Sequence, residues 1–147
     1  MRWLSPWVVL MMSLNTVSHA QDSLPISVSN AWIREGPPVV STLAGYAQVE
    51  NLTDREIALV RATSPDFATV EFHRSEVVDG LARMLEEPVI VIAAGASVSF
   101  EPGGLHMMLM NPRRTFKAGD RVIVELRLSS GRLMRVEIPV LKQAPKR

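Results

Sequence analysis

The stretch RVIVELRLSSGRLMRVEIPV, residues 121–140, contains two runs rich in Val and Ile on either side of Ser129-Ser130-Gly131. Such runs favour β-strands and the small residues between them favour a turn, so the stretch predicts a β-hairpin. Similar runs recur toward the N-terminus at a spacing of roughly ten residues, separated by Gly, Pro, Asn and Asp. They predict strands over residues 26–35, 44–51, 56–63, 69–76, 81–86, 88–94, 97–101 and 105–110. Because no window of a dozen residues has helical periodicity, we expect an all-β antiparallel sandwich or barrel.

The first twenty residues, MRWLSPWVVLMMSLNTVSHA, have a different character from the rest of the chain. They contain a basic residue at Arg2, an apolar stretch over residues 7–14 and small residues on both sides of His19, which is the layout of a secretory signal peptide. The apolar stretch is short for a membrane span, although an uncleaved anchor is the alternative. We expect residues 1–20 to be removed and residues 21–147 to form one exported domain without a membrane span.

The composition excludes several classes of protein. The chain contains no cysteine, so the exported domain uses neither disulfides nor thiol chemistry. Removal of Arg2 lowers the formal charge from +1 to zero, and there is no long basic run, which argues against nucleic acid as a partner. No nucleophile elbow, catalytic triad or phosphate-binding glycine motif is present, so we expect a protein that is not an enzyme.

The stretch GGLHMMLMNP, residues 103–112, places three methionines around a histidine. On a strand, successive side chains point to opposite faces, so Leu105, Met107 and Leu109 are predicted to share the core face. His106 and Met108 then lie on the other face together with Met110, where an imidazole and a thioether can both reach one metal ion. From this stretch alone the methionines can be interpreted either as metal ligands or as packing residues, because methionine also fills irregular gaps in a core.

The other histidine of the exported domain, His73, lies in the strand-like run VEFHRSE on its more polar face. Met84 follows beyond the Asp79-Gly80 turn and has charged neighbours, an unusual setting for a core residue. Each histidine thus has a methionine that could approach it. Trp32 and Tyr46 are interpreted as packing residues of the sandwich.

The spacing of these residues is specific: His73, ten residues, Met84, twenty-one residues, His106, one residue, Met108. It resembles the His-x10-Met-x21-His-x-Met pattern of the periplasmic copper chaperones called the PCuAC family. Further segments that resemble this family are AWIR at residues 31–34, AGYAQVEN at residues 44–51 and PGGLHMMLM at residues 102–110. The resemblance covers nearly all of the predicted domain.

The resemblance implies a cupredoxin-like Greek-key β-sandwich that binds one Cu(I) through His73, Met84, His106 and Met108. It also implies a monomer in the periplasm that delivers copper to a respiratory oxidase, at the copper centre of a cytochrome c oxidase subunit or through its assembly factors. Some members of the family have a methionine directly after the first histidine, where this chain has Arg74. Others have a His- and Met-rich C-terminal extension; the tail here has neither residue, so one copper site is expected.

The chemistry of these side chains agrees with the resemblance. Two imidazoles and two thioethers form a soft, neutral set that suits Cu(I) and serves Zn(II) poorly. Only the imidazoles compete with protons, so copper affinity should decline as the pH falls below about 6. A copper redox protein is disfavoured, because it would require a thiolate or further imidazoles to stabilise Cu(II). The remaining alternative is a metal-free sandwich that binds a protein partner through an edge strand, with the methionines as core.

Overall fold

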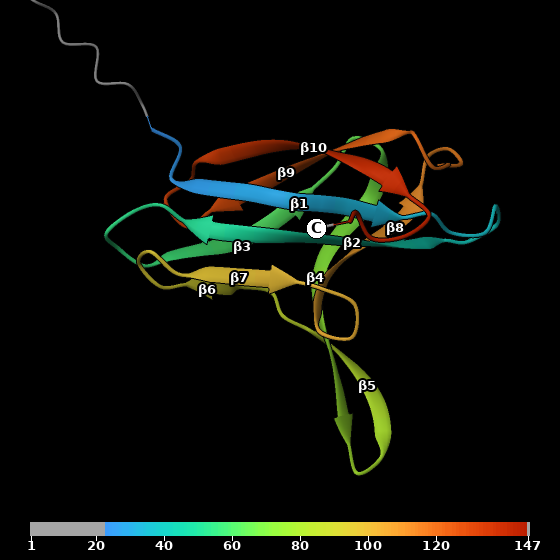
Figure 1. Cartoon of the computed structure of the whole chain (residues 1–147), viewed down its shortest axis with the longest axis horizontal. Helices are drawn as coiled ribbons and strands as arrows, with labels where there is room; N and C mark the ends of the chain where they lie inside the picture. Colours follow the sequence, from blue (N-terminus) through green and yellow to red (C-terminus); the bar gives the residue numbers. More distant parts are fainter. Residues whose placement is uncertain (1–22, 147) are drawn as a thin grey trace, which may run out of the picture.

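The computed structural model describes residues 23–146, which form ten β-strands and no helix (Figure 1). The strands are β1 (Ile26–Arg34), β2 (Thr42–Asn51), β3 (Ile57–Thr63), β4 (Phe67–Val78), β5 (Leu81–Glu86), β6 (Ile90–Ile92), β7 (Ser97–Phe100), β8 (Leu105–Pro112), β9 (Arg121–Leu128) and β10 (Leu133–Leu141). Every strand expected from the sequence is present, so the all-β prediction is confirmed. The predicted signal peptide, residues 1–20, lies outside the described residues. Within residues 23–146, no helix has the length and apolar character that a membrane crossing requires.

The strands form one sheet in the order β5-β4-β8-β2-β1-β10-β9-β3-β6. An additional pairing of β3 with β4, between Ala62 and Val70, closes the sheet on itself. β7 pairs with the C-terminal half of β2, next to the segment of β2 that pairs with β8. Among the described strands, only β1 and β10 pair in parallel. The sequence did not predict this parallel pair, because local strand signals do not report the pairing of the first strand with the last.

The core-facing side of β8 is formed by Leu105, Met107 and Leu109, which are 2%, 3% and 0% exposed. The prediction that these three residues belong to the core is confirmed, and alternation places His106 and Met108 on the opposite, outer face. β2 packs closely beside β8 at Gly45, where a Cβ atom would lie 3.1 Å from a methyl carbon of Leu109. The absence of a side chain at Gly45 therefore leaves room for the core-facing Met107 and Leu109 side chains beside β2.

The hairpin of β4 and β5 projects from the body of the molecule, and we call its projecting part the arm (Figure 1). Its turn consists of Asp79 and Gly80, with φ angles of 52° and 74°. Two successive positive φ angles are the mark of a type I′ turn, whose twist matches that of a hairpin. β5 pairs only with β4, and all six of its residues are exposed. The arm thus carries Met84 outside the core, as its charged neighbours indicated.

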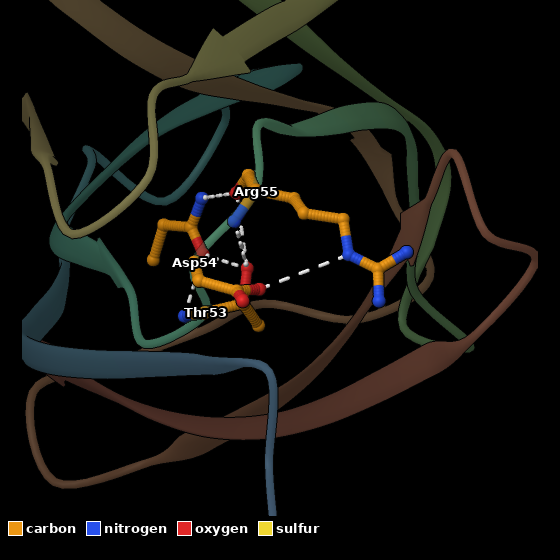
Figure 2. Close-up of polar contacts among 4 residues, drawn as sticks. Thr53, Asp54 and Arg55 are labelled. Atoms are coloured by element: carbon orange, nitrogen blue, oxygen red, sulfur yellow. Dashed lines mark hydrogen bonds and ion pairs between the residues drawn. The ribbon is translucent and has the colours of Figure 1, made fainter.

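A buried amide ties the turn after β2 to the end of β6. Asn51 is 0% exposed, and its Nδ2 atom donates hydrogen bonds to the carbonyl oxygens of Arg55, Ile92 and Ala93 at 2.6, 3.0 and 3.1 Å. Its Oδ1 atom accepts from the backbone N–H and the hydroxyl of Thr53 at 2.9 and 2.8 Å. Figure 2 shows this turn around Thr53, Asp54 and Arg55. Asn51 is therefore a structural residue, although it begins the sequence Asn-Leu-Thr, which resembles a glycosylation site.

Candidate metal centre

His73 on β4 and His106 on β8 are directly paired neighbours on the outer face of the sheet. Their ring centroids lie 6.3 Å apart, with an angle of 37° between the ring planes. His106 is only 6% exposed, and the His73 side chain is 15% exposed. The two imidazoles predicted from the sequence, 33 positions apart in the numbering, are thus adjacent in space.

The register of the neighbouring strands places both predicted methionines on the same face as these rings. Met108 is paired with Glu71, which lies two residues before His73 on the same face of β4. Met84 is paired with Ser75, two residues after His73 on that face. Residues diagonal to one another across a strand pair lie about 7–8 Å apart, which long side chains can span. The fold therefore places the other three predicted ligands at positions neighbouring His73 on one face; we call this surface the His/Met face.

The His/Met face is graded in its exposure to solvent. Met84, on the arm, is 53% exposed, whereas Met108 is half-buried between β2 and β4. Met110 lies on the same face but two residues farther along β8, opposite Thr69 and away from the arm. A ligand set placed in this way combines two well-fixed imidazoles with one thioether that solvent or another protein can reach.

The ring of His106 is oriented by a backbone carbonyl. Its Nδ1 atom lies 3.0 Å from the carbonyl oxygen of Gly104, which also accepts the backbone N–H of Ser75 at 3.1 Å. A carbonyl oxygen only accepts, so a neutral His106 that makes this contact carries its proton on Nδ1 and its lone pair on Nε2. The turn before β8 makes this contact possible, because Gly103 has a φ of 81° that favours glycine.

The ring of His73 is oriented by a carboxylate. Its Nε2 atom lies 2.8 Å from Oε2 of Glu71, and this contact becomes an ion pair when the imidazole is protonated. The other ring nitrogen, Nδ1, is buried, and no hydrogen-bond partner for it exists among residues 23–146. The sequence alone assigned no role to Glu71. Its position two residues before His73 in a predicted strand indicates that both side chains lie on one face, and this pattern could have identified it as a neighbour of His73.

Arg74, which directly follows His73, does not reach this face. It alternates with His73 on β4 and forms a bidentate contact with Glu87 on the opposite side. The interaction with Glu87 raises the pKa of the Arg74 guanidinium, although desolvation opposes the shift. Arg74 therefore adds no side chain to the His/Met face.

The donor set of this face determines which metals it suits. Among residues 23–146, no group of three or more His, Cys, Asp or Glu side chains is placed to hold a metal ion. A metal with several ligands here would need thioether sulfur in addition to imidazole nitrogen. This combination favours a soft monovalent ion such as Cu(I) over Zn(II) or Mg(II).

Solved structures with this fold include copper-binding domains. The chain is similar to the solution structure of CuI-DR1885 from Deinococcus radiodurans, with 28% identity, a TM-score of 0.66 and coverage of 85% of this chain and 84% of that chain. It also matches the copper-bound PCuAC domain from PmoF2, with 23% identity, a TM-score of 0.67 and coverage of 82% and 94%. The architecture is thus the cupredoxin-like β-sandwich of PCuAC domains, and the predicted fold class is confirmed.

Comparison of sequences gives the same assignment. The model of the family described as "Putative lipoprotein LpqE-like" matches residues 26–140. A protein of Leifsonia xyli subsp. xyli named "Putative lipoprotein Lxx21020" is 30% identical over 116 residues, which cover 78% of this chain and 69% of that protein. The chain belongs to the LpqE-like family, which is of the PCuAC type, and the family predicted from the His and Met spacing is confirmed.

Proposed function

We propose that this chain is an exported Cu(I) chaperone that binds one copper ion through His73, Met84, His106 and Met108. The observation that supports the proposal is the His/Met face, where the register of three adjacent strands puts these four residues at neighbouring positions on one face. Two similar structures are named as copper-bound, and the family points to a copper-binding protein that is not an enzyme. Copper is therefore the cargo of this protein and not a cofactor for a reaction.

We further propose that copper leaves the chain by ligand exchange and passes to the copper centre of a cytochrome c oxidase. The partial exposure of the His/Met face supports exchange, because Met84 is 53% exposed on β5, which pairs with no strand other than β4. A ligand from a recipient can replace this thioether while the two imidazoles still hold the ion. The signal-like residues 1–20 and the lipoprotein names in the family support export to the periplasm.

Cu(I) binding is tested by anaerobic titration of residues 21–147 in competition with a chromophoric Cu(I) chelator. We expect one tight equivalent, and Met84→Leu should weaken binding by at least about tenfold, because even changes outside the ligand set often cost that much. Met134→Leu is the matched control, because Met134 is 8% exposed within the core cluster and should leave affinity unchanged. A parent chain that cannot compete with the chelator would exclude the proposed function.

Delivery is tested separately with the Cu(I)-loaded chain and the apo form of the copper-centre domain of a cytochrome c oxidase. After mixing and separation by size, metal analysis should find copper in the recipient fraction. A recipient already loaded with copper is the control, and in its presence copper should stay with the chaperone. Retention of copper by the chain, beside a recipient that takes Cu(I) from the chelator complex, would exclude delivery and leave a storage protein.

A further inference from the structure

Glu71 is the only carboxylate among the described residues for which a hydrogen bond to a histidine ring is found, at 2.8 Å from Nε2 of His73. An ionised carboxylate only accepts hydrogen bonds, so this contact puts the proton of a neutral His73 on Nε2. The lone pair of such a ring is then on Nδ1. This arrangement is the reverse of that in His106, where the Gly104 carbonyl holds the proton on Nδ1.

The surroundings of Nδ1 of His73 favour the binding of a ligand at this atom. This atom is buried, and residues 23–146 provide no hydrogen-bond donor to it. Buried polar atoms without a partner are rare, because each loses its hydrogen bonds to water without compensation. A metal ion on the His/Met face would supply the missing partner, since a deprotonated imidazole nitrogen is a metal ligand.

We infer that Glu71 is a positioning residue that holds His73 in the Nε2–H tautomer, so that Cu(I) binds to Nδ1 of His73 and to Nε2 of His106. This inference rests on the proposed copper site and adds the coordinating atom of each ring. A carboxylate that orients a metal-binding histidine through its other nitrogen also increases the basicity of the ligand. Because Glu71 is paired with Met108 across β4 and β8, it also lies beside a proposed thioether ligand.

The tautomer is measured first without copper, by ¹⁵N NMR of the histidine rings at a pH where both are neutral. In the apo protein, Nε2 of His73 and Nδ1 of His106 should have the frequencies of protonated nitrogens. Addition of Cu(I), which is diamagnetic, should then shift Nδ1 of His73 and Nε2 of His106. A proton on Nδ1 of His73 in the apo protein, or a copper-induced shift centred on its Nε2, would overturn the inference.

Variants of Glu71 separate a role in positioning from an effect of charge. Glu71→Ala should mix the two tautomers of His73 and weaken Cu(I) binding by about 10- to 100-fold. Glu71→Gln retains an acceptor oxygen and should preserve most of the Nε2–H tautomer. Glu86→Gln is the matched control, because Glu86 is the exposed neighbour of His73 on β5, and its loss should change affinity by less than about fivefold.

The outcomes of these measurements are distinguishable from a failure of the proposed function. If Glu71→Ala leaves both the tautomer and the affinity unchanged, or if Glu86→Gln weakens binding equally, Glu71 does not position His73. If the parent binds no Cu(I) although apo His73 has the Nε2–H tautomer, the copper site itself is wrong. Circular dichroism of each variant checks the fold, and Glu71→Gln keeps the test decisive if Glu71→Ala does not fold.

Discussion

A His106→Ala, Met108→Leu double variant is expected to lose Cu(I) affinity by at least about a hundredfold, because changes to residues that merely support metal ligands already cost up to this much. Both replaced side chains lie on the outer face of β8, next to His73 and Glu71. The two proposed ligands that remain, His73 and Met84, come from β4 and from the arm. They leave one imidazole and one exposed thioether, which cannot enclose the ion.

Met107→Leu is the matched control for this experiment. Met107 is adjacent to both replaced residues in sequence, but it is 3% exposed and faces the core. A volume-conserving apolar substitution there costs less than about 1.5 kcal/mol of stability and should leave the copper affinity unchanged. Chelator competition measures the affinity, and urea unfolding shows that each variant is folded. If the double variant binds Cu(I) as tightly as the parent, the methionines are packing residues and the exposed edge of β5 becomes the candidate site for a protein partner.

The largest loss of stability is expected for Asn51→Ala, far from the His/Met face. The substitution removes the amide that joins the turn after β2 to the carbonyl oxygens of Ile92 and Ala93. A buried acceptor left without its donor costs about 1–3 kcal/mol, so the free energy of unfolding should fall by about 3 kcal/mol in total. Urea denaturation measures this change, and Cu(I) affinity of the folded fraction should be unaffected.

Gln48→Ala provides the comparison, because Gln48 is on the same strand but exposed. Substitutions at exposed positions usually change stability by no more than about 0.5 kcal/mol. Asn51→Asp should be at least as harmful as Asn51→Ala at neutral pH, because it sets a carboxylate against three carbonyl oxygens. A parent-like unfolding midpoint for Asn51→Ala would show that the amide does not hold this turn.

Local sequence signals predicted the strands and the two faces of β8. Turn residues separate every strand, and alternation along residues 105–110 correctly assigned Met107 to the core and His106 to the outer face. Such signals have a range of a few residues, so they could not provide the pairing of β1 with β10 or the closure of β3 onto β4. The proximity of His73 and His106 was inferred from family resemblance, and only the register between β4 and β8 places them side by side.

The contact between Glu71 and His73 could not be read from local pattern for a different reason. Alternation placed both on one face, but carboxylates on a polar strand face are usually solvated. The distance of 2.8 Å and the buried, unpartnered Nδ1 atom give Glu71 its significance. These features depend on side-chain conformation and on the burial of the ring beneath its neighbours. Secondary-structure patterns contain neither kind of information.

The arm of β4 and β5 is attached to the rest of the proposed chaperone at one end only (Figure 1). Its base lies in the closed sheet beside the histidines, and its outer strand, β5, pairs only with β4 and has every residue exposed. We expect bending of this arm to move the sulfur of Met84 without disturbing the closed sheet, because opening of a weakly packed element costs little free energy. We therefore expect the rate of copper release from the proposed site to depend on the arm, and the stability of the fold to depend on the core.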